Sequence, residues 1–135
     1  MNFTSEIVKV DEAERNVFGW AYVAIDEEGK VNIDKQEDFI DDPSELENMG
    51  YGFVVDSRRG DAMHFRKGVA TLIESIVFTP EKIEKMGVSG VPALGWWIGM
   101  HVNDDATWDL VEKGTFKGFS IGGNGTRTKA GNPND

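Results

Sequence analysis

Three side chains of the sequence have the chemistry that amide hydrolysis by a serine requires. Ser120 lies in residues 117–123 (KGFSIGG), where glycines on both sides let the backbone approach a substrate and leave amides free to bind an oxyanion. The chain has two histidines, His64 and His101. A serine nucleophile needs a base within hydrogen-bond reach of its hydroxyl. Because the chain contains no cysteine, a Ser–His pair is the nucleophilic arrangement that the composition favours.

Position alone leaves a structural explanation open for each of these residues. His64 falls between an expected helix and an expected strand, where a histidine is more often simply exposed to solvent. His101 falls in an expected strand, and a structural role is favoured more strongly there. The glycines around Ser120 do not form the G-x-S-x-G turn of the α/β-hydrolases. The motifs alone therefore describe a soluble α+β domain whose function stays open.

Two other groups of residues could bind a ligand. Carboxylates between residues 34 and 42 could hold a divalent cation through oxygen ligands, although a solvated loop with a helix cap explains them equally well. The carboxylates are those of Asp34, Asp38, Asp41 and Asp42. Trp96 and Trp97 could line a ligand groove, although tryptophans in strands more often pack in a core. No cofactor and no metal are expected from these patterns.

Composition limits the classes of partner. The chain has 135 residues, enough for one domain, and a formal net charge of -10 from 24 acidic and 14 basic side chains. Such a surface repels nucleic-acid phosphates and anionic lipids, so neither is expected as a partner. The N-terminal residues do not have the pattern of a signal peptide, and no apolar run reaches membrane-spanning length. A soluble intracellular protein is expected.

Strands and short helices alternate along the chain. Strands are expected at 6–10, 17–25, 69–78, 95–102 and 116–122, and a turn at 26–29 is expected to start a return strand at Val31 and Ile33. Asp42 and Pro43 predict the start of a helix that ends near residues 57–60. Two shorter helices are expected after residues 79–80 and 103–105. The pattern predicts a mixed sheet, or a barrel with peripheral helices.

Six blocks occur in a fixed order that points to a known family. The blocks are VFGWAYVAI (17–25), DKQEDFID (34–41), MH (63–64), VATLIESIVFTPEK (69–82), GWWIGMHVNDDATWDLV (95–111) and KGFSIGG (117–123). In this order they resemble the XkdF-like family of phage serine proteases, which is related to the prohead proteases and similar to the herpesvirus assemblins. The resemblance extends from about residue 17 to residue 123.

This resemblance implies an α+β fold, mainly an antiparallel β-barrel of the prohead-protease type with short peripheral helices. It implies a serine endopeptidase of capsid maturation that acts inside the procapsid, in the host cytoplasm. The expected partners are the phage scaffold and major capsid proteins. The enzyme is also expected to cleave itself. The resemblance is compatible with a homodimer. By position in the blocks, Ser120 corresponds to the nucleophile and His64 to its base. Residues 1–123 are expected to form the protease-like domain and residues 124–135 a polar, flexible tail.

The remaining catalytic roles are less defined. We expect the backbone amides near Gly122 and Gly123, together with Arg127, to bind the oxyanion. A segment that prohead proteases carry after the nucleophile strand is absent from the sequence, so the residue that orients His64 is open. Glu74 is the first candidate, because a carboxylate can hold the correct imidazole tautomer, and His101 is the second. The alternative function is a catalytically incomplete, protease-like module that binds scaffold or capsid proteins.

Overall fold

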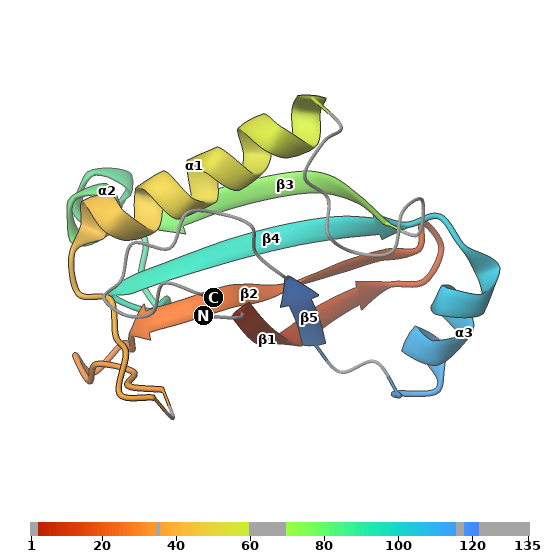
Figure 1. Ribbon diagram of the computed structural model, residues 1–135, viewed down its shortest axis with the longest axis horizontal. Coiled ribbons are helices and arrows are strands. Elements are labelled where there is room, and N and C mark those ends of the chain that lie inside the picture. Colours follow the sequence, from red (N-terminus) through yellow and green to blue (C-terminus); the bar gives the residue numbers. More distant parts are fainter. Residues whose placement is uncertain (1–2, 35, 60–69, 116–117, 122–135) are drawn as a thin grey trace.

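The computed structural model describes residues 3–34, 36–59, 70–115 and 118–121. Within these ranges the chain has an α+β fold, with an antiparallel sheet in the strand order β3-β4-β2-β1-β5 and three helices (Figure 1). The elements in chain order are β1 (Phe3–Asp11), β2 (Asn16–Ile25), α1 (Pro43–Arg59), β3 (Ala70–Phe78), α2 (Pro80–Met86), β4 (Leu94–Val102), α3 (Asp105–Glu112) and β5 (Gly118–Ile121). Every strand and helix expected from the sequence is present, except the return strand after residue 29.

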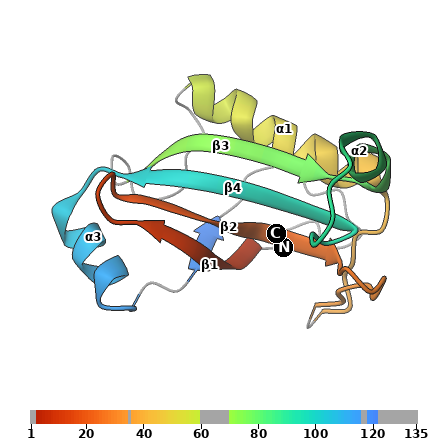
Figure 2. The same cartoon turned by 180° about the vertical axis from the view of Figure 1, so that it is seen from behind.

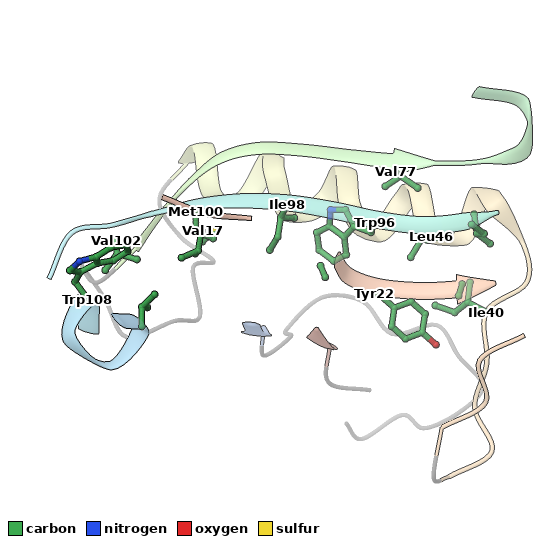
Figure 3. Packing of buried hydrophobic residues seen from close by; sticks show 14 residues of the cluster. Val17, Tyr22, Ile40, Leu46, Val77, Trp96, Ile98, Met100, Val102 and Trp108 are labelled. Atoms are coloured by element: carbon green, nitrogen blue, oxygen red, sulfur yellow. The ribbon is translucent and has the colours of Figure 1, made fainter. Parts of the chain in front are cut away.

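The hydrophobic core lies against one face of the sheet, which we call the core face. Alternate residues of β4 point to this face, as the period of a strand requires, and all of them are buried: Leu94, Trp96, Ile98, Met100 and Val102. Side chains from β2, β3, α1 and α3, together with Ile40, complete the cluster. Figure 3 shows Trp96, Ile98 and Met100 projecting from the same side of β4.

Helix α1 begins as its sequence predicts and lies close to the sheet. The Asp42 carboxylate accepts a hydrogen bond from the Ser44 amide at 3.0 Å, and Pro43 occupies the first helical position. Figure 1 shows α1 running along β3. Gly50 permits this approach, because a methyl group there would lie 2.7 Å from Cγ2 of Val77.

The two short helices are fixed by local capping. The Thr79 hydroxyl accepts a hydrogen bond from the Lys82 amide at the start of α2, and Gly87 ends the helix with a left-handed backbone, φ 70°. Asp104 caps α3 in the same way, since its carboxylate accepts hydrogen bonds from both the amide and the hydroxyl of Thr107. These caps confirm the two helix starts that the sequence predicted.

Strand β1 bends and serves two partners. Its first residues, up to Glu6, pair with β5, whereas Ile7 to Asp11 pair with β2, and the register shifts between Ile7 and Lys9. Strands β3 and β5 are the two edges of the sheet that the described residues form. This sheet is open, so the expected barrel is not confirmed. Seen from behind, β3, β4 and β2 lie side by side (Figure 2).

The prediction of a return strand that starts at Val31 and Ile33 is wrong. Val31 makes only an isolated bridge with Ile25, and the Asn32 amide donates to the Ala24 carbonyl. Immediately afterwards the Asp34 carboxylate accepts hydrogen bonds from the amides of Gln36 and Asp38. This turn directs the chain away from β2 before a ladder can extend.

No helix in the described ranges is long and apolar enough to cross a membrane.

Candidate functional site

Ser120, the expected nucleophile, lies on edge strand β5. This strand pairs antiparallel with the start of β1, and Ser120 stands opposite Thr4 in the register. His64, Gly122, Gly123 and Arg127 lie outside the described residues, so their expected roles stay predictions. The structure therefore places the backbone of Ser120 at one edge of the described sheet.

Glu74, the first candidate for orienting the histidine, lies on the other edge strand, β3. Three strands separate β3 from β5 in the sheet order. Four spacings of about 4.8 Å correspond to roughly 19 Å along a flat sheet. The Glu74 carboxylate accepts a hydrogen bond of 2.9 Å from Nε1 of Trp97. Within the described sheet, Glu74 is not a neighbour of Ser120.

His101, the second candidate, lies on central strand β4. Its Nδ1 is 2.8 Å from Oδ1 of Asn16, the residue opposite it on β2. Strands β2 and β1 stand between β4 and β5. The described sheet therefore places neither candidate on a strand adjacent to that of Ser120.

A comparison with models of protein families assigns the chain to one family. Residues 4–129 match the family described as "Putative phage serine protease XkdF". The chain belongs to this family. The match includes Ser120 and His64, and it confirms the resemblance seen in the six sequence blocks. No curated protein and no solved structure matches the chain.

Besides the edge that carries Ser120, this member of the XkdF family has a second feature with the character of a site. On the sheet face opposite the core, large side chains from three strands gather into what we call the aromatic face: Phe18, Trp20, Ile76, Phe78 and Trp97. All five are half-buried rather than buried. The sequence reasoning treated Trp96 and Trp97 as a pair. Strand alternation separates them, because Trp96 is in the core and Trp97 is on the aromatic face.

The rings of the aromatic face hold one another in place. Trp97 stacks on Phe18 with ring centroids 6.5 Å apart and meets the edge of Trp20 at 5.0 Å. Trp20 in turn meets Phe78 edge to face at 5.7 Å. Gly99 leaves room between the strands, because a methyl group there would lie 2.8 Å from both Phe18 and Glu74. The side chains on either side of β4 can therefore approach each other.

The acidic stretch after β2 is used for local structure. Asp34 accepts backbone hydrogen bonds in a turn, and Asp42 caps α1. Across the described parts of the chain, no three His, Asp or Glu side chains are grouped so that they could hold a metal ion. The cation site considered from this stretch therefore gains no support from the geometry.

Two shifted pKa values concern structure rather than proton transfer at Ser120. Burial raises the pKa of Tyr22 to about 12, and the nearby carboxylates of Asp34, Asp38 and Glu45 add to the effect. Burial alone would lower the pKa of Lys82, but its hydrogen bonds with Tyr51 and Glu47 outweigh burial and raise that pKa. Both groups are protonated at neutral pH, so neither provides a base.

Proposed function

We propose that this XkdF-family protein is a serine endopeptidase of phage capsid maturation. It cleaves the scaffold protein, the capsid precursor and itself inside the procapsid, in the host cytoplasm. The observation that carries the proposal is the family match over residues 4–129, which includes the KGFSIGG block around Ser120. The position of Ser120 on edge strand β5 supports it, because an edge strand has a side that no other described strand covers.

In this mechanism the Ser120 hydroxyl attacks the scissile carbonyl carbon. His64 accepts the hydroxyl proton and then donates it to the leaving amine, which leaves an acyl-enzyme that water hydrolyses. The backbone amides of Gly122 and Gly123 stabilise the oxyanion of each tetrahedral intermediate, and the Arg127 guanidinium adds positive charge there. Removing one oxyanion donor in other serine proteases lowers turnover by about 10²–10³.

The position of Glu74 connects its role to the barrel that the resemblance implies. In a closed sheet the two edges, β3 and β5, would become neighbours, and Glu74 would then lie on the strand beside Ser120. In the open sheet of the described residues the carboxylate accepts a hydrogen bond from Trp97, and three strands separate its strand from β5. Orientation of His64 by Glu74 therefore requires that the sheet closes.

The second candidate function is a protease-like module that binds scaffold or capsid protein without cleaving it. The observation that favours it is the separation of Glu74 and His101 from β5. A histidine without an orienting partner loses much of its efficiency as a base, by about 10⁴ when the partner is changed in the Ser-His-Asp template. The two functions differ in whether new chain ends appear in the partner proteins.

Intact-mass spectrometry after co-expression with the phage's own scaffold and capsid proteins separates them. The chain is expressed as wild type and as Ser120→Ala, His64→Ala and Ser89→Ala, the last being a control serine exposed in a loop. The protease predicts truncated partners with wild type and Ser89→Ala, and full-length partners with the other two. Full-length partners in all four samples, recovered in complex with the chain, would support the binding module.

A further inference from the structure

The aromatic face carries a hollow with one charged group in it. The hollow has a volume of about 410 Å³, within the range of ligand-binding clefts. Its lining is mostly apolar, with one carboxylate and one serine among the described residues: Trp20, Ile76, Phe78, Val91, Trp97, Glu74 and Ser75. A carboxylate among aromatic rings is a favourable site for a cation, because the ring faces and the carboxylate both attract positive charge.

Glu74 is available to such a cation. Its carboxylate accepts a hydrogen bond from Trp97 and is exposed, and no described lysine or arginine forms an ion pair with it. The hydrogen bond leaves acceptor capacity on the carboxylate, which has two oxygens with about four lone-pair sites. Trp97 therefore holds the carboxylate in position, and no lysine or arginine of the described ranges pairs with it.

The aromatic face already accepts a cation elsewhere. Nζ of Lys9, on β1, lies 5.0 Å from the centroid of the Phe18 ring. The hollow offers the rings of Trp20, Phe78 and Trp97 for a second contact of the same kind, with Glu74 beside them. Tryptophan is the best of the aromatic side chains at this interaction.

The helices of the described ranges do not pack on the aromatic face. Helix α1 contacts the core face, where Phe53 meets Trp96, and α3 places Trp108 in the core. Helix α2 is bound to α1 through Lys82. In the view from behind, none of these helices crosses the middle of β3, β4 and β2 (Figure 2). The hollow also borders β3, an edge of the described sheet, so an extended segment can lie beside it.

We propose that the aromatic face is a docking site for an extended protein segment that carries an arginine or a lysine between apolar residues. Charge complementarity selects this occupant: the chain has a net charge of -10, and Glu74 is the charged group in the hollow. Nucleic acid is repelled by the same charges. A second copy of the chain would bring ten further negative charges to the contact, which disfavours self-association there. The site is separate from Ser120 and does not depend on catalysis.

The test uses the full chain labelled with ¹⁵N and follows its tryptophan indole signals by NMR. The probe is the peptide acetyl-Thr-Val-Thr-Arg-Thr-Val-Thr-amide, whose arginine and valines share one side of an extended chain. The matched probe has glutamine in place of arginine. We expect the arginine peptide to shift the indole signals of Trp20 and Trp97 in a saturable way and to leave that of Trp108 unchanged. The glutamine peptide should bind about three- to tenfold more weakly.

Two charge-matched variants assign the effect to Glu74. Glu74→Gln keeps an oxygen that can accept from Trp97 but removes the charge, and Glu112→Gln removes one charge from α3, away from the hollow. We expect the dissociation constant of the arginine peptide to rise about three- to tenfold in Glu74→Gln and to stay unchanged in Glu112→Gln.

Three results would overturn the docking site. The first is the absence of a saturable shift at Trp20 and Trp97 up to millimolar peptide. The second is equal binding of the arginine and glutamine peptides, or equal weakening by the two variants. The third is a shift of the Trp97 signal on dilution of the chain alone, which would identify a second copy as the occupant. All three are independent of whether Ser120 cleaves a substrate.

Discussion

Trp97 Nε1 donates a hydrogen bond of 2.9 Å to Oε1 of Glu74 on the neighbouring strand. The bond joins β4 to the edge strand β3 on the aromatic face, and it fixes the one carboxylate that sequence reasoning had favoured as the orienting group of a catalytic triad. A carboxylate held by an indole at one edge of the sheet is poorly placed to orient a histidine that serves a serine at the other edge. Structural and catalytic roles of Glu74 therefore predict different outcomes for a single substitution.

Glu74→Gln distinguishes these roles. In the open sheet we expect partner cleavage to stay within about threefold of wild type, because the amide oxygen still accepts from Trp97 and three strands separate Glu74 from the strand of Ser120. An orienting carboxylate would show a loss of about 10⁴, as the equivalent change does in the Ser-His-Asp template. The measurement is the rate of appearance of truncated capsid or scaffold protein. A loss of that size would show that the sheet closes and brings β3 to β5.

Gly50 and Gly52 form a matched pair on α1. A methyl group at Gly50 would lie 2.7 Å from Val77 Cγ2, whereas one at Gly52 meets nothing within 4 Å. Gly50→Ala should lower the free energy of unfolding by about 1–2 kcal/mol, because the overlap outweighs the gain in helix propensity. Gly52→Ala should raise it by roughly 0.5–1 kcal/mol.

Urea unfolding followed by tryptophan fluorescence measures both values. A stabilising effect of Gly50→Ala equal to that of Gly52→Ala would mean that α1 does not contact β3 as closely as the structure has it.

Lys82 joins α2 to α1 and to the sheet. Its Nζ lies 3.0 Å from Glu47 Oε2, 2.9 Å from the Tyr51 hydroxyl and 2.9 Å from the Val77 carbonyl oxygen. Lys82→Met should destabilise the fold by about 1 kcal/mol. The control is Lys85→Met, which breaks an exposed pair with Glu81 at 3.6 Å and should have little effect. Equal thermal midpoints for the two variants would contradict the linking role of Lys82.

The contribution of this cluster depends on pH in a defined direction. The hydrogen bond from Lys82 holds the pKa of Glu47 below its usual 4.5. A lowered carboxyl pKa gives stability that is fully present above this usual value of 4.5 and is lost as the pH falls through the lower pKa of the folded state. The stability difference between wild type and Lys82→Met should therefore be constant near neutral pH and shrink below about pH 4. Chemical unfolding at a series of pH values measures it, and a difference that grows on acidification would contradict the assignment.

Local signals predicted the helices and most strands well. Asp42, Thr79 and Asp104 each precede a helix, and each side chain accepts the backbone hydrogen bond that its position predicted. The return strand at Val31 was lost to a turn made by Asp34, a competing local signal three residues later. Hydrophobic alternation alone does not show whether the strand signal at Val31 or the turn signal at Asp34 determines the local structure.

The order of the strands in the sheet is a tertiary property, and the sequence patterns did not predict it. Nothing local shows that β3 and β5 are opposite edges, or that β1 bends at Ile7 to pair with two partners. The separation of Glu74 from Ser120 follows from that order. The split of Trp96 and Trp97 between two faces, by contrast, was available from strand alternation.

The most direct test of serine-protease chemistry is covalent labelling by a fluorophosphonate, which bonds to an activated serine oxygen with loss of fluoride. Wild type, Ser120→Ala, His64→Ala and Ser89→Ala are treated and mapped by peptide mass spectrometry. The account predicts one adduct, at Ser120, in wild type and in Ser89→Ala, no adduct in Ser120→Ala, and strongly reduced labelling in His64→Ala. Unlabelled Ser120 in the wild type, or labelling of Ser120 at the same rate after removal of His64, would contradict it.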